Sequence, residues 1–290
     1  MKKVKKFDVI NNLMLIFCAL LCLIPFVLLI TSSFQSETSI MRDGYSFWPS
    51  EWSLDAYRYL FGQGGQLIHA YMISIFVTVV GTIVGLLLTL MLAYTLAQKD
   101  LPGRGVLAFF VFFTMLFNGG LVPSYIMWTT VFHIKNTIWA LLLPNLLVKA
   151  FFVILARSYF QTNLPTEIQE SARIDGAGEV QIFVQIAVPL AKPIISTLLL
   201  FIGLSYWNDW NNGLIYLTDN NLYSIQNVLN EMIKSIQFLS QNAASVSAVA
   251  LPSNGVRMAI AVVATVPVLV AYPFLQKGFV KGIVMGGVKG

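Results

Sequence analysis

Charged residues are scarce in this sequence, since Asp, Glu, Lys and Arg together account for 11% of its 290 residues, whereas hydrophobic residues account for 57%. A soluble domain covers its surface with about 25% charged residues. The mean hydropathy is +0.74, so most of the exterior must face lipid rather than water. A disordered chain is excluded as well, because aromatic residues make up 13% and the apolar runs are long. The composition therefore predicts an integral membrane protein.

Cysteine and histidine are also rare, with two of each. Cys18 and Cys22 lie one helical turn apart in an apolar run, where we expect them to pack as small hydrophobic residues. A disulfide scaffold would need more cysteines, and His69 and His133 are too isolated for a zinc site. The P-loop, GxGxxG and HExxH patterns are absent. We therefore predict that this chain is not an enzyme and binds neither a metal nor a cofactor.

Six apolar runs are long enough to cross the hydrocarbon core as helices, which takes about 20 residues. They cover residues 10–31, 70–97, 106–131, 138–156, 182–206 and 258–275. Each is apolar on all sides, which favours helices over the alternating strands of a barrel. The first run is too long for a cleaved signal peptide. The predicted fold class is an all-α integral membrane protein with six transmembrane helices, of which the third can kink at Asn118-Gly119-Gly120.

The distribution of Lys and Arg predicts the orientation in the membrane. The net charge of +5 is concentrated at the chain ends and in alternate loops, as the positive-inside rule places it, and this pattern does not indicate nucleic-acid binding. Both termini are then cytoplasmic, as an even number of spans requires. The predicted organisation is a cytoplasmic N-terminus (1–9), a first span (10–31), an extracytoplasmic loop (32–69), a core (70–275) and a cytoplasmic tail (276–290). Within the core, the loop 157–181 is cytoplasmic and the loop 207–257 is extracytoplasmic.

The cytoplasmic loop 157–181 leads into the most informative segment. Pro165 suits the first turn of a helix, and Thr166 with Gln169 can form a capping box. Ile168 and Ala172 would form a narrow apolar stripe before Asp175-Gly176 ends the helix. A helix this short is marginal alone and needs a surface to dock against. The alternative is an amphipathic connector that lies on lipid headgroups.

The same segment carries a family resemblance. It reads Glu170-Ser171-Ala172-Arg173-Ile174-Asp175-Gly176-Ala177, then Ile186-Ala187-Val188-Pro189 after a gap. This pattern resembles the EAA loop of ATP-binding-cassette (ABC) importer permeases, with Ser171 in place of an alanine and Val188 in place of a leucine. The tail 276–290 resembles that of the smaller permease subunit of maltose-type importers. The stretches 117–123 and 207–211 resemble the branch for oligosaccharides and polysaccharide fragments, including alginate and lipoprotein-associated permeases.

The resemblance implies a type I importer permease of the bacterial plasma membrane that imports oligosaccharides. Its partners would be a homologous second permease subunit, two copies of an ATPase that carry ATP and Mg, and an extracytoplasmic sugar-binding protein. The loop 211–254 resembles the family loop that probes this binding protein, or it is a simple connector. The implied ATPase-coupling residues are Glu170, Ser171, Ala172, Asp175, Gly176 and Pro189. The implied ATPase-contacting tail is Gly286, Gly287, Val288, Lys289 and Gly290, unless this end only frays.

Candidate substrate contacts are polar and aromatic residues near the spans. Sugars accept hydrogen bonds and stack on aromatic rings, so the group Tyr206, Trp207, Asn208, Trp210 and Asn211 can line a path, or it can form an interfacial aromatic belt. Asn118 and Asn145 lie at span positions that favour a polar cavity. Lys149 is a charge inside a predicted span, where it would meet an anionic sugar or a carboxylate on a neighbouring subunit.

Other function classes fit the sequence less well. A permease of the same machinery for peptides or amino acids can share the EAA loop, but the tail and the Asn-Gly-Gly stretch argue against it. An integral-membrane enzyme would need clustered Asp, Glu, His or Ser inside the spans. A secondary transporter would need an inverted repeat and ion-coupling carboxylates. The small residues Gly81 and Gly85 in the second run permit close helix approach, which can serve subunit pairing or internal packing.

Overall fold

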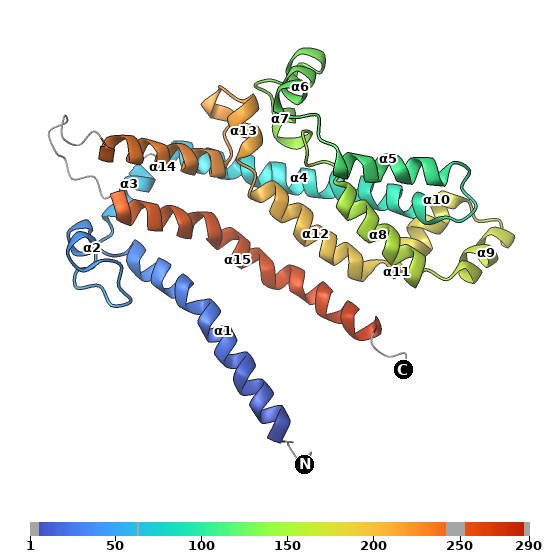
Figure 1. Cartoon of the computed structure of the whole chain (residues 1–290), viewed down its shortest axis with the longest axis horizontal. Helices are drawn as coiled ribbons and strands as arrows, with labels where there is room; N and C mark the ends of the chain where they lie inside the picture. The colour runs from blue at the N-terminus through green and yellow to red at the C-terminus, as the bar shows by residue number, and fades with distance from the viewer. Residues whose placement is uncertain (1–5, 63, 242–252, 287–290) are drawn as a thin grey trace. The chain divides into compact units, whose positions relative to one another are not determined.

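The computed structural model describes residues 6–62, 64–241 and 253–286 (Figure 1). These residues are helical or irregular, and their one extended pairing is an isolated antiparallel bridge between Gln35 and Trp52. The chain divides into two compact units, Met1–Ile68 with Leu229–Pro267 and His69–Val228 with Val268–Gly290. The predicted helical fold class is confirmed.

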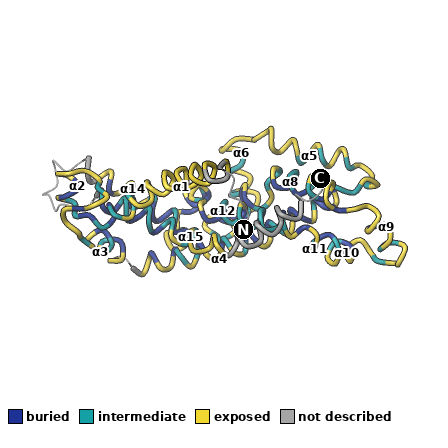
Figure 2. The backbone as a smooth tube through the Cα atoms, turned by 90° about the horizontal axis from the view of Figure 1, so that it is seen from below, coloured by how far each residue is buried: buried dark blue, intermediate teal, exposed yellow. Residues whose placement is uncertain are grey.

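The first unit is built on one long lipid-facing helix. Helix α1 (Lys6–Ser33) has a mean hydropathy of 3.2 over its apolar window and buries none of that window in the protein (Figure 2). Helices α2 (Glu37–Asp43) and α3 (Asp55–Gly62) follow. The Glu37 carboxylate accepts hydrogen bonds from Asn254 N at 3.1 Å and Gly255 N at 3.1 Å, at the start of α15 (Ser253–Gly286). This carboxylate satisfies free amides at a helix N-terminus, where the helix dipole favours negative charge.

The second unit contains the remaining helices. They are α4 (Gly64–Ala97), α5 (Arg104–Leu116), α6 (Leu121–Ile126), α7 (Trp139–Leu142), α8 (Ala150–Asn163), α9 (Thr166–Ile174), α10 (Glu179–Ile182), α11 (Val188–Leu190), α12 (Lys192–Trp207) and α13 (Asn211–Tyr216). Helix α4 begins in the first unit, and α14 (Ile225–Gln241) begins in the second unit and lies mostly in the first. Two π-helical turns, Met127–Val131 and Phe183–Ala187, extend α6 and α10. Helix α8 packs against α5 and α12, so its buried face forms the centre of this unit.

Within the described residues, three helices are long and apolar enough to cross a membrane: Ile10–Ser33, Gly65–Ala97 and Asn254–Pro273. Two bent pairs raise the number to five. The pair Arg104–Leu116 and Leu121–Val131 bends by 114°, and the pair Glu179–Leu190 and Lys192–Tyr216 bends by 83°. The first bend confirms the interruption expected at Asn118-Gly119-Gly120, where Gly120 adopts a φ of 86°.

The fourth expected span, 138–156, is not one helix. Helix α7 ends at Leu142 and α8 begins only at Ala150. Between them, Pro144 has no amide to donate to a helix, and Asn145 adopts a φ of 59°. Lys149 therefore precedes the first turn of α8 in an extended conformation, rather than lying inside a helix as expected.

Two glycines of α4, Gly81 and Gly85, are used for packing within this chain. A Cβ atom added at Gly81 would collide with the ring of Tyr206 on α12, and one added at Gly85 would lie 2.8 Å from the Leu147 carbonyl oxygen. The Tyr206 hydroxyl donates to the Leu142 carbonyl at 2.9 Å. Helix α4 therefore lies close to α12 and to the segment before α8. This arrangement favours internal packing as the role of the small-residue pattern.

Candidate functional site

Helix α9 lies in the segment that the sequence singles out, but its start differs from the expected one. Pro165 is the N-cap and makes no side-chain capping bond, so Thr166 is the first helical residue and the expected capping box is not formed. Gln169 is instead buried, with 4% of its surface exposed. Its side-chain carbonyl accepts a hydrogen bond from Gln98 Nε2 at 3.0 Å, at the end of α4. The hydrogen bond to Gln98 therefore takes the place of the local cap, because it holds the Gln169 side chain in the interior.

The end of α9 is as expected. Gly176 adopts a φ of 84°, its amide donates to the Arg173 carbonyl at 3.1 Å, and the Ala177 amide donates to the Ala172 carbonyl at 2.9 Å. These two bonds are the Schellman motif, which requires a left-handed residue and therefore favours glycine. A Cβ atom added at Gly176 would meet no atom of this chain within 4 Å. The constraint on this residue is therefore its backbone conformation.

The faces of α9 are not those of the predicted apolar stripe. Gln169 is buried, and Ala172 and Arg173 are half-buried, so the inward face follows the i, i+3, i+4 spacing. Ile168 and Ile174 point outward and are 45% and 86% exposed. The outward residues Glu167, Glu170, Ser171, Ile174 and Asp175 are all exposed, and we call them the coupling face (Figure 2). It combines carboxylates with an uncovered isoleucine, which suits contact with a protein surface.

A polar network joins α9 to α4 and α10. Arg173 Nε donates to Glu179 Oε1 at 2.7 Å, and Arg173 Nη2 donates to Gln98 Oε1 at 3.4 Å. The Tyr94 hydroxyl donates to Glu179 Oε2 at 3.4 Å. The hydrogen bond that Arg173 donates to Glu179 raises the pKa of the Arg173 guanidinium above its ordinary value, so the pair stays ionised at neutral pH. The ion pair is partly exposed and adds little stability, but it fixes the direction of α9.

The other predicted coupling and tail residues lie away from the coupling face. Ala172 is half-buried and packs on the core of the second unit. Pro189 lies in α11, beside the 83° bend at Ala191. Gly286 is the last residue of α15, and Gly287, Val288, Lys289 and Gly290 lie outside the described residues.

The predicted substrate residues at the end of α12 divide into two groups. Tyr206 and Trp207 are buried, with Tyr206 packed at Gly81 and Trp207 6.3 Å from the Tyr71 ring. The structure therefore uses both for packing. Asn208, Trp210 and Asn211 are exposed. The division coincides with the end of α12, since its last two residues are buried and the exposed residues lie in the link and at the start of α13.

The remaining predicted substrate residues are dispersed. The Asn118 side chain accepts the Gly120 amide at 2.9 Å and supports the bend between α5 and α6. Asn145 is exposed in the link between α7 and α8. Lys149 is half-buried, and its Nζ lies 5.8 Å from the centroid of the Phe152 ring. Lys149 interacts electrostatically with Asp209 of its own chain, but it forms no ion pair with a carboxylate of the described residues.

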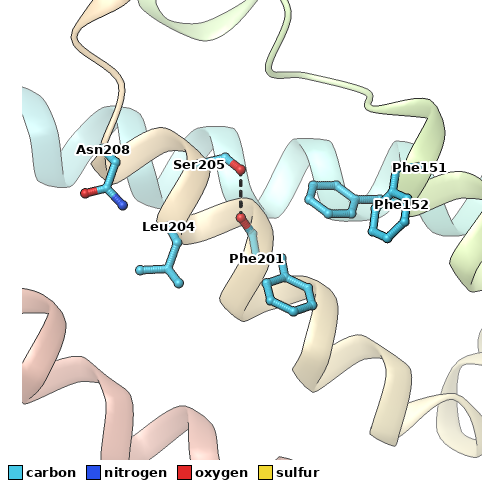
Figure 3. Close-up of a pocket in the computed structure, with 6 residues that line it drawn as sticks. All are labelled: Phe151, Phe152, Phe201, Leu204, Ser205 and Asn208. Atoms are coloured by element: carbon cyan, nitrogen blue, oxygen red, sulfur yellow. Dashed lines mark hydrogen bonds between the residues drawn. The ribbon is translucent and has the colours of Figure 1, made fainter. Parts of the chain in front are cut away.

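A cavity of about 400 Å³ lies between α8 and α12, as Figure 3 shows. It is lined by Phe151, Phe152, Phe201, Leu204, Ser205 and Asn208. The Phe152 and Phe201 rings are parallel within 3°, with centroids 6.3 Å apart. Apolar ring faces with a few polar groups are typical of small-molecule sites, and aromatic rings suit sugar rings. Of the predicted residues only Asn208 lines this cavity, because the phenylalanines resemble ordinary span residues in the sequence.

Comparison with known proteins places this geometry in context. No protein-family model matches the sequence. Protein LplC of Bacillus subtilis is 38% identical over 284 residues, which cover 98% of this chain and 95% of the relative. The polygalacturonan/rhamnogalacturonan transport system permease protein YtcP of Bacillus subtilis is 37% identical over 289 residues, which cover 99% of this chain and 100% of the relative.

A solved structure shares the fold. It belongs to a bacterial ABC transporter involved in the import of the acidic polysaccharide alginate, and it matches with a TM-score of 0.77 and 26% sequence identity. The match covers 96% of this chain and 99% of that chain. Agreement over almost the full length of both chains shows that the two chains share their overall fold.

Proposed function

Because this chain belongs to the permease subunits of ABC carbohydrate importers, we propose that it forms half of a transmembrane path for oligosaccharides and is moved through α9 by a separate ATPase. It is an integral protein of the bacterial plasma membrane. Its relatives are transporter permeases rather than enzymes. ATP and Mg are accordingly assigned to the partner ATPase subunits, of which we propose two copies.

We propose six spans with both termini in the cytoplasm. Three single helices and two bent pairs supply five spans. Helix α8, together with the link that contains Lys149, supplies the sixth. This arrangement puts α9 and the turn at 98–105, which carries Lys99 and Arg104, on the cytoplasmic side. The domain boundaries predicted from the sequence are kept in this proposal, with the tail 276–290 beside the ATPase.

The coupling proposal rests on one observation: α9 presents an exposed coupling face while its opposite side is tied to α4 and α10. Glu170, Ser171, Asp175 and Gly176 would contact the ATPase. Ala172, Gln169 and Arg173 would hold the helix in place. A push on the exposed side is then transmitted to the end of α4, because the contacts on the buried side resist rotation of α9.

The coupling proposal is tested by cross-linking in the assembled importer. Cys18 and Cys22 are first replaced with serine, since both are exposed on α1. Glu170→Cys should then form a disulfide-length cross-link with cysteines placed on the ATPase surface, and Asn118→Cys, exposed between α5 and α6, should not. Exclusive labelling of Glu170→Cys by lipid-phase reagents would overturn the coupling role.

The oligosaccharide proposal is tested by stimulated turnover. The chain is co-purified with its second permease subunit, its ATPase and its binding protein in lipid nanodiscs. Binding protein loaded with the correct oligosaccharide should raise ATP hydrolysis several-fold above that with empty binding protein. If no neutral or acidic oligosaccharide of a broad panel raises turnover, the carbohydrate assignment to this path fails.

A second proposal concerns the charge of the sugar. Two relatives handle polymers of acidic sugars, as the names polygalacturonan and alginate state. In this chain, Lys149 Nζ lies 5.8 Å from the centroid of the Phe152 ring, and Phe152 lines the aromatic cavity. We therefore propose that Lys149 contacts a sugar carboxylate while the rings of Phe152 and Phe201 support the sugar faces.

Lys149→Gln should reduce uptake of oligogalacturonate about tenfold, which corresponds to the loss of one charge-assisted hydrogen bond of about 1.5 kcal/mol. Lys149→Arg, which keeps the charge, should retain most of the uptake. Radiolabelled uptake into proteoliposomes measures both. Equal loss for a neutral oligosaccharide of the same length would show that Lys149 has a structural role instead.

A further inference from the structure

A second, smaller cavity lies on the inner side of α9. Its volume is about 140 Å³, the space of four or five water molecules at roughly 30 Å³ each. The polar part of its wall consists of Gln98, Lys99, Arg104, Gln161, Thr166 and Gln169. These residues come from the α4–α5 turn, the end of α8 and the first turn of α9. The cavity therefore lies at the joint between the coupling helix and α4.

The cavity has two cations and no carboxylate in its wall. Among the described residues, neither Lys99 nor Arg104 forms an ion pair. Arg104 Nη1 donates to the Gln98 carbonyl at 3.3 Å, which leaves most of its guanidinium donors available. Asp100 follows Lys99 in the chain but does not line the cavity. The wall thus offers two cations that no carboxylate of the same wall pairs with.

The amide groups of the wall are already oriented. Gln98 donates to Gln169 and accepts from Arg173, so its side chain cannot rotate to compensate the two cations. The Thr166 hydroxyl stands at the first turn of α9 and adds a donor. A planar guanidinium, an ammonium and a hydroxyl around a space of this size match the oxygen atoms of a phosphate group.

The surroundings of Arg104 indicate a source for that phosphate. Arg104 is the first residue of α5, and none of the residues of α5 is buried. Val106, Phe109 and Phe110 are 60%, 58% and 59% exposed, which suits a helix facing lipid. The basic residues therefore stand where an apolar, lipid-facing helix begins, which is the level of the phosphates in the inner leaflet.

We propose that the cavity lined by Lys99, Arg104 and Thr166 binds a phosphate group, supplied by an anionic phospholipid headgroup. The bound phosphate bridges the α4–α5 turn and the first turn of α9. The binding itself is independent of the proposed transport function, but its effect on coupling rests on that function. Loss of the phosphate should loosen the joint and weaken the transmission of motion from α9 to α4.

The test uses the assembled importer and two double variants of equal charge change. Lys99→Gln/Arg104→Gln removes both cations of the cavity. Lys135→Gln/Lys192→Gln removes two exposed cations that do not line it. Each complex is purified in neutral detergent and titrated with phosphatidylglycerol, and bound lipid is counted by native mass spectrometry. A second arm titrates inorganic phosphate into lipid-free complex by calorimetry.

The wild type and the control variant should each retain one phosphatidylglycerol. The cavity variant should bind this lipid roughly 30-fold more weakly, because each cation near a lipid phosphate raises the affinity about fivefold. Saturable inorganic phosphate binding that is lost in the cavity variant also supports the site, and it then assigns the phosphate to a soluble source. Equal binding of both ligands by all three complexes, or binding of neither, overturns the proposal. Stimulated ATP hydrolysis of the wild type is measured in parallel, so failure of the transport assignment is recognised separately.

Discussion

Replacing Gly176 with valine will reduce oligosaccharide uptake at least tenfold and leave the amount of inserted protein unchanged. Gly176 has a φ of 84°, a conformation in which a β-branched residue is a genuine outlier. The strain is of order 1–3 kcal/mol, enough to shift the last turn of α9 out of the Schellman geometry. Asp175 and Glu170 on the coupling face would then be displaced from the ATPase. Uptake and ATPase stimulation in proteoliposomes measure the effect.

Gly178 provides the matched control for this variant. It lies two residues further on, has a φ of −74°, and a Cβ atom there also meets no atom of the chain within 4 Å. Gly178→Val therefore adds the same bulk without the same strain and should retain most of the uptake. If both variants transport normally, the geometry of the end of α9 is not needed for coupling. If both are equally impaired, bulk in this loop rather than backbone conformation is responsible.

The second large effect is expected at Gly81, where alanine should lower the midpoint of thermal unfolding by about 2–9 °C, at roughly 2–3 °C per kcal/mol for a chain of this size. The added methyl group collides with the buried Tyr206 ring, and overpacking of this kind costs about 1–3 kcal/mol. The ring cannot move away freely because its hydroxyl is bonded to the Leu142 carbonyl. Thermal unfolding of the purified complex, followed by size-exclusion fluorescence, measures the shift.

Two variants test the cause of that destabilisation. Gly203→Ala places a methyl group 3.5 Å from Thr82 Oγ1, an ordinary contact, and should leave the midpoint unchanged. Tyr206→Leu combined with Gly81→Ala should recover part of the loss, because the smaller side chain vacates the ring position. A Gly81→Ala protein as stable as the wild type would contradict the close packing of α4 on α12.

The candidate site shows where sequence reasoning succeeds and where it fails. The end of α9 was predictable, because Asp-Gly chemistry acts locally through the left-handed conformation of Gly176. The orientation of α9 was not, because Gln169 is buried by a hydrogen bond from Gln98, 71 residues away in the chain. The pattern of apolar residues alone predicts that the face with Ile168 is buried. The hydrogen bond between Gln98 and Gln169 instead buries the face with Gln169. The partnership of Arg173 with Glu179 left no recognisable signal in the sequence.

The positions of Lys149 and of the aromatic residues at the end of α12 also depend on more than the local sequence pattern. Lys149 lay in an apolar run that predicted a helix, yet Pro144 and the left-handed Asn145 end α7 early and leave Lys149 ahead of α8. Tyr206 and Asn208 are two residues apart and were predicted to act together. Packing on α4 instead buries Tyr206, whereas Asn208 follows the last residue of α12 and lines the aromatic cavity.

The sequence alone determined that the protein resides in a membrane, that its third apolar run is interrupted near Asn118, and that a short polar helix resembles an ABC coupling segment. These properties depend on composition and on local backbone preferences, which act between neighbouring residues. Only the tertiary structure decided which side of α9 faces out, that Gly81 accommodates Tyr206, and that Phe152, the ring near Lys149, lines one cavity with Phe201. Such arrangements depend on contacts between residues that are distant in the sequence, and a local sequence pattern does not reveal which of these contacts form.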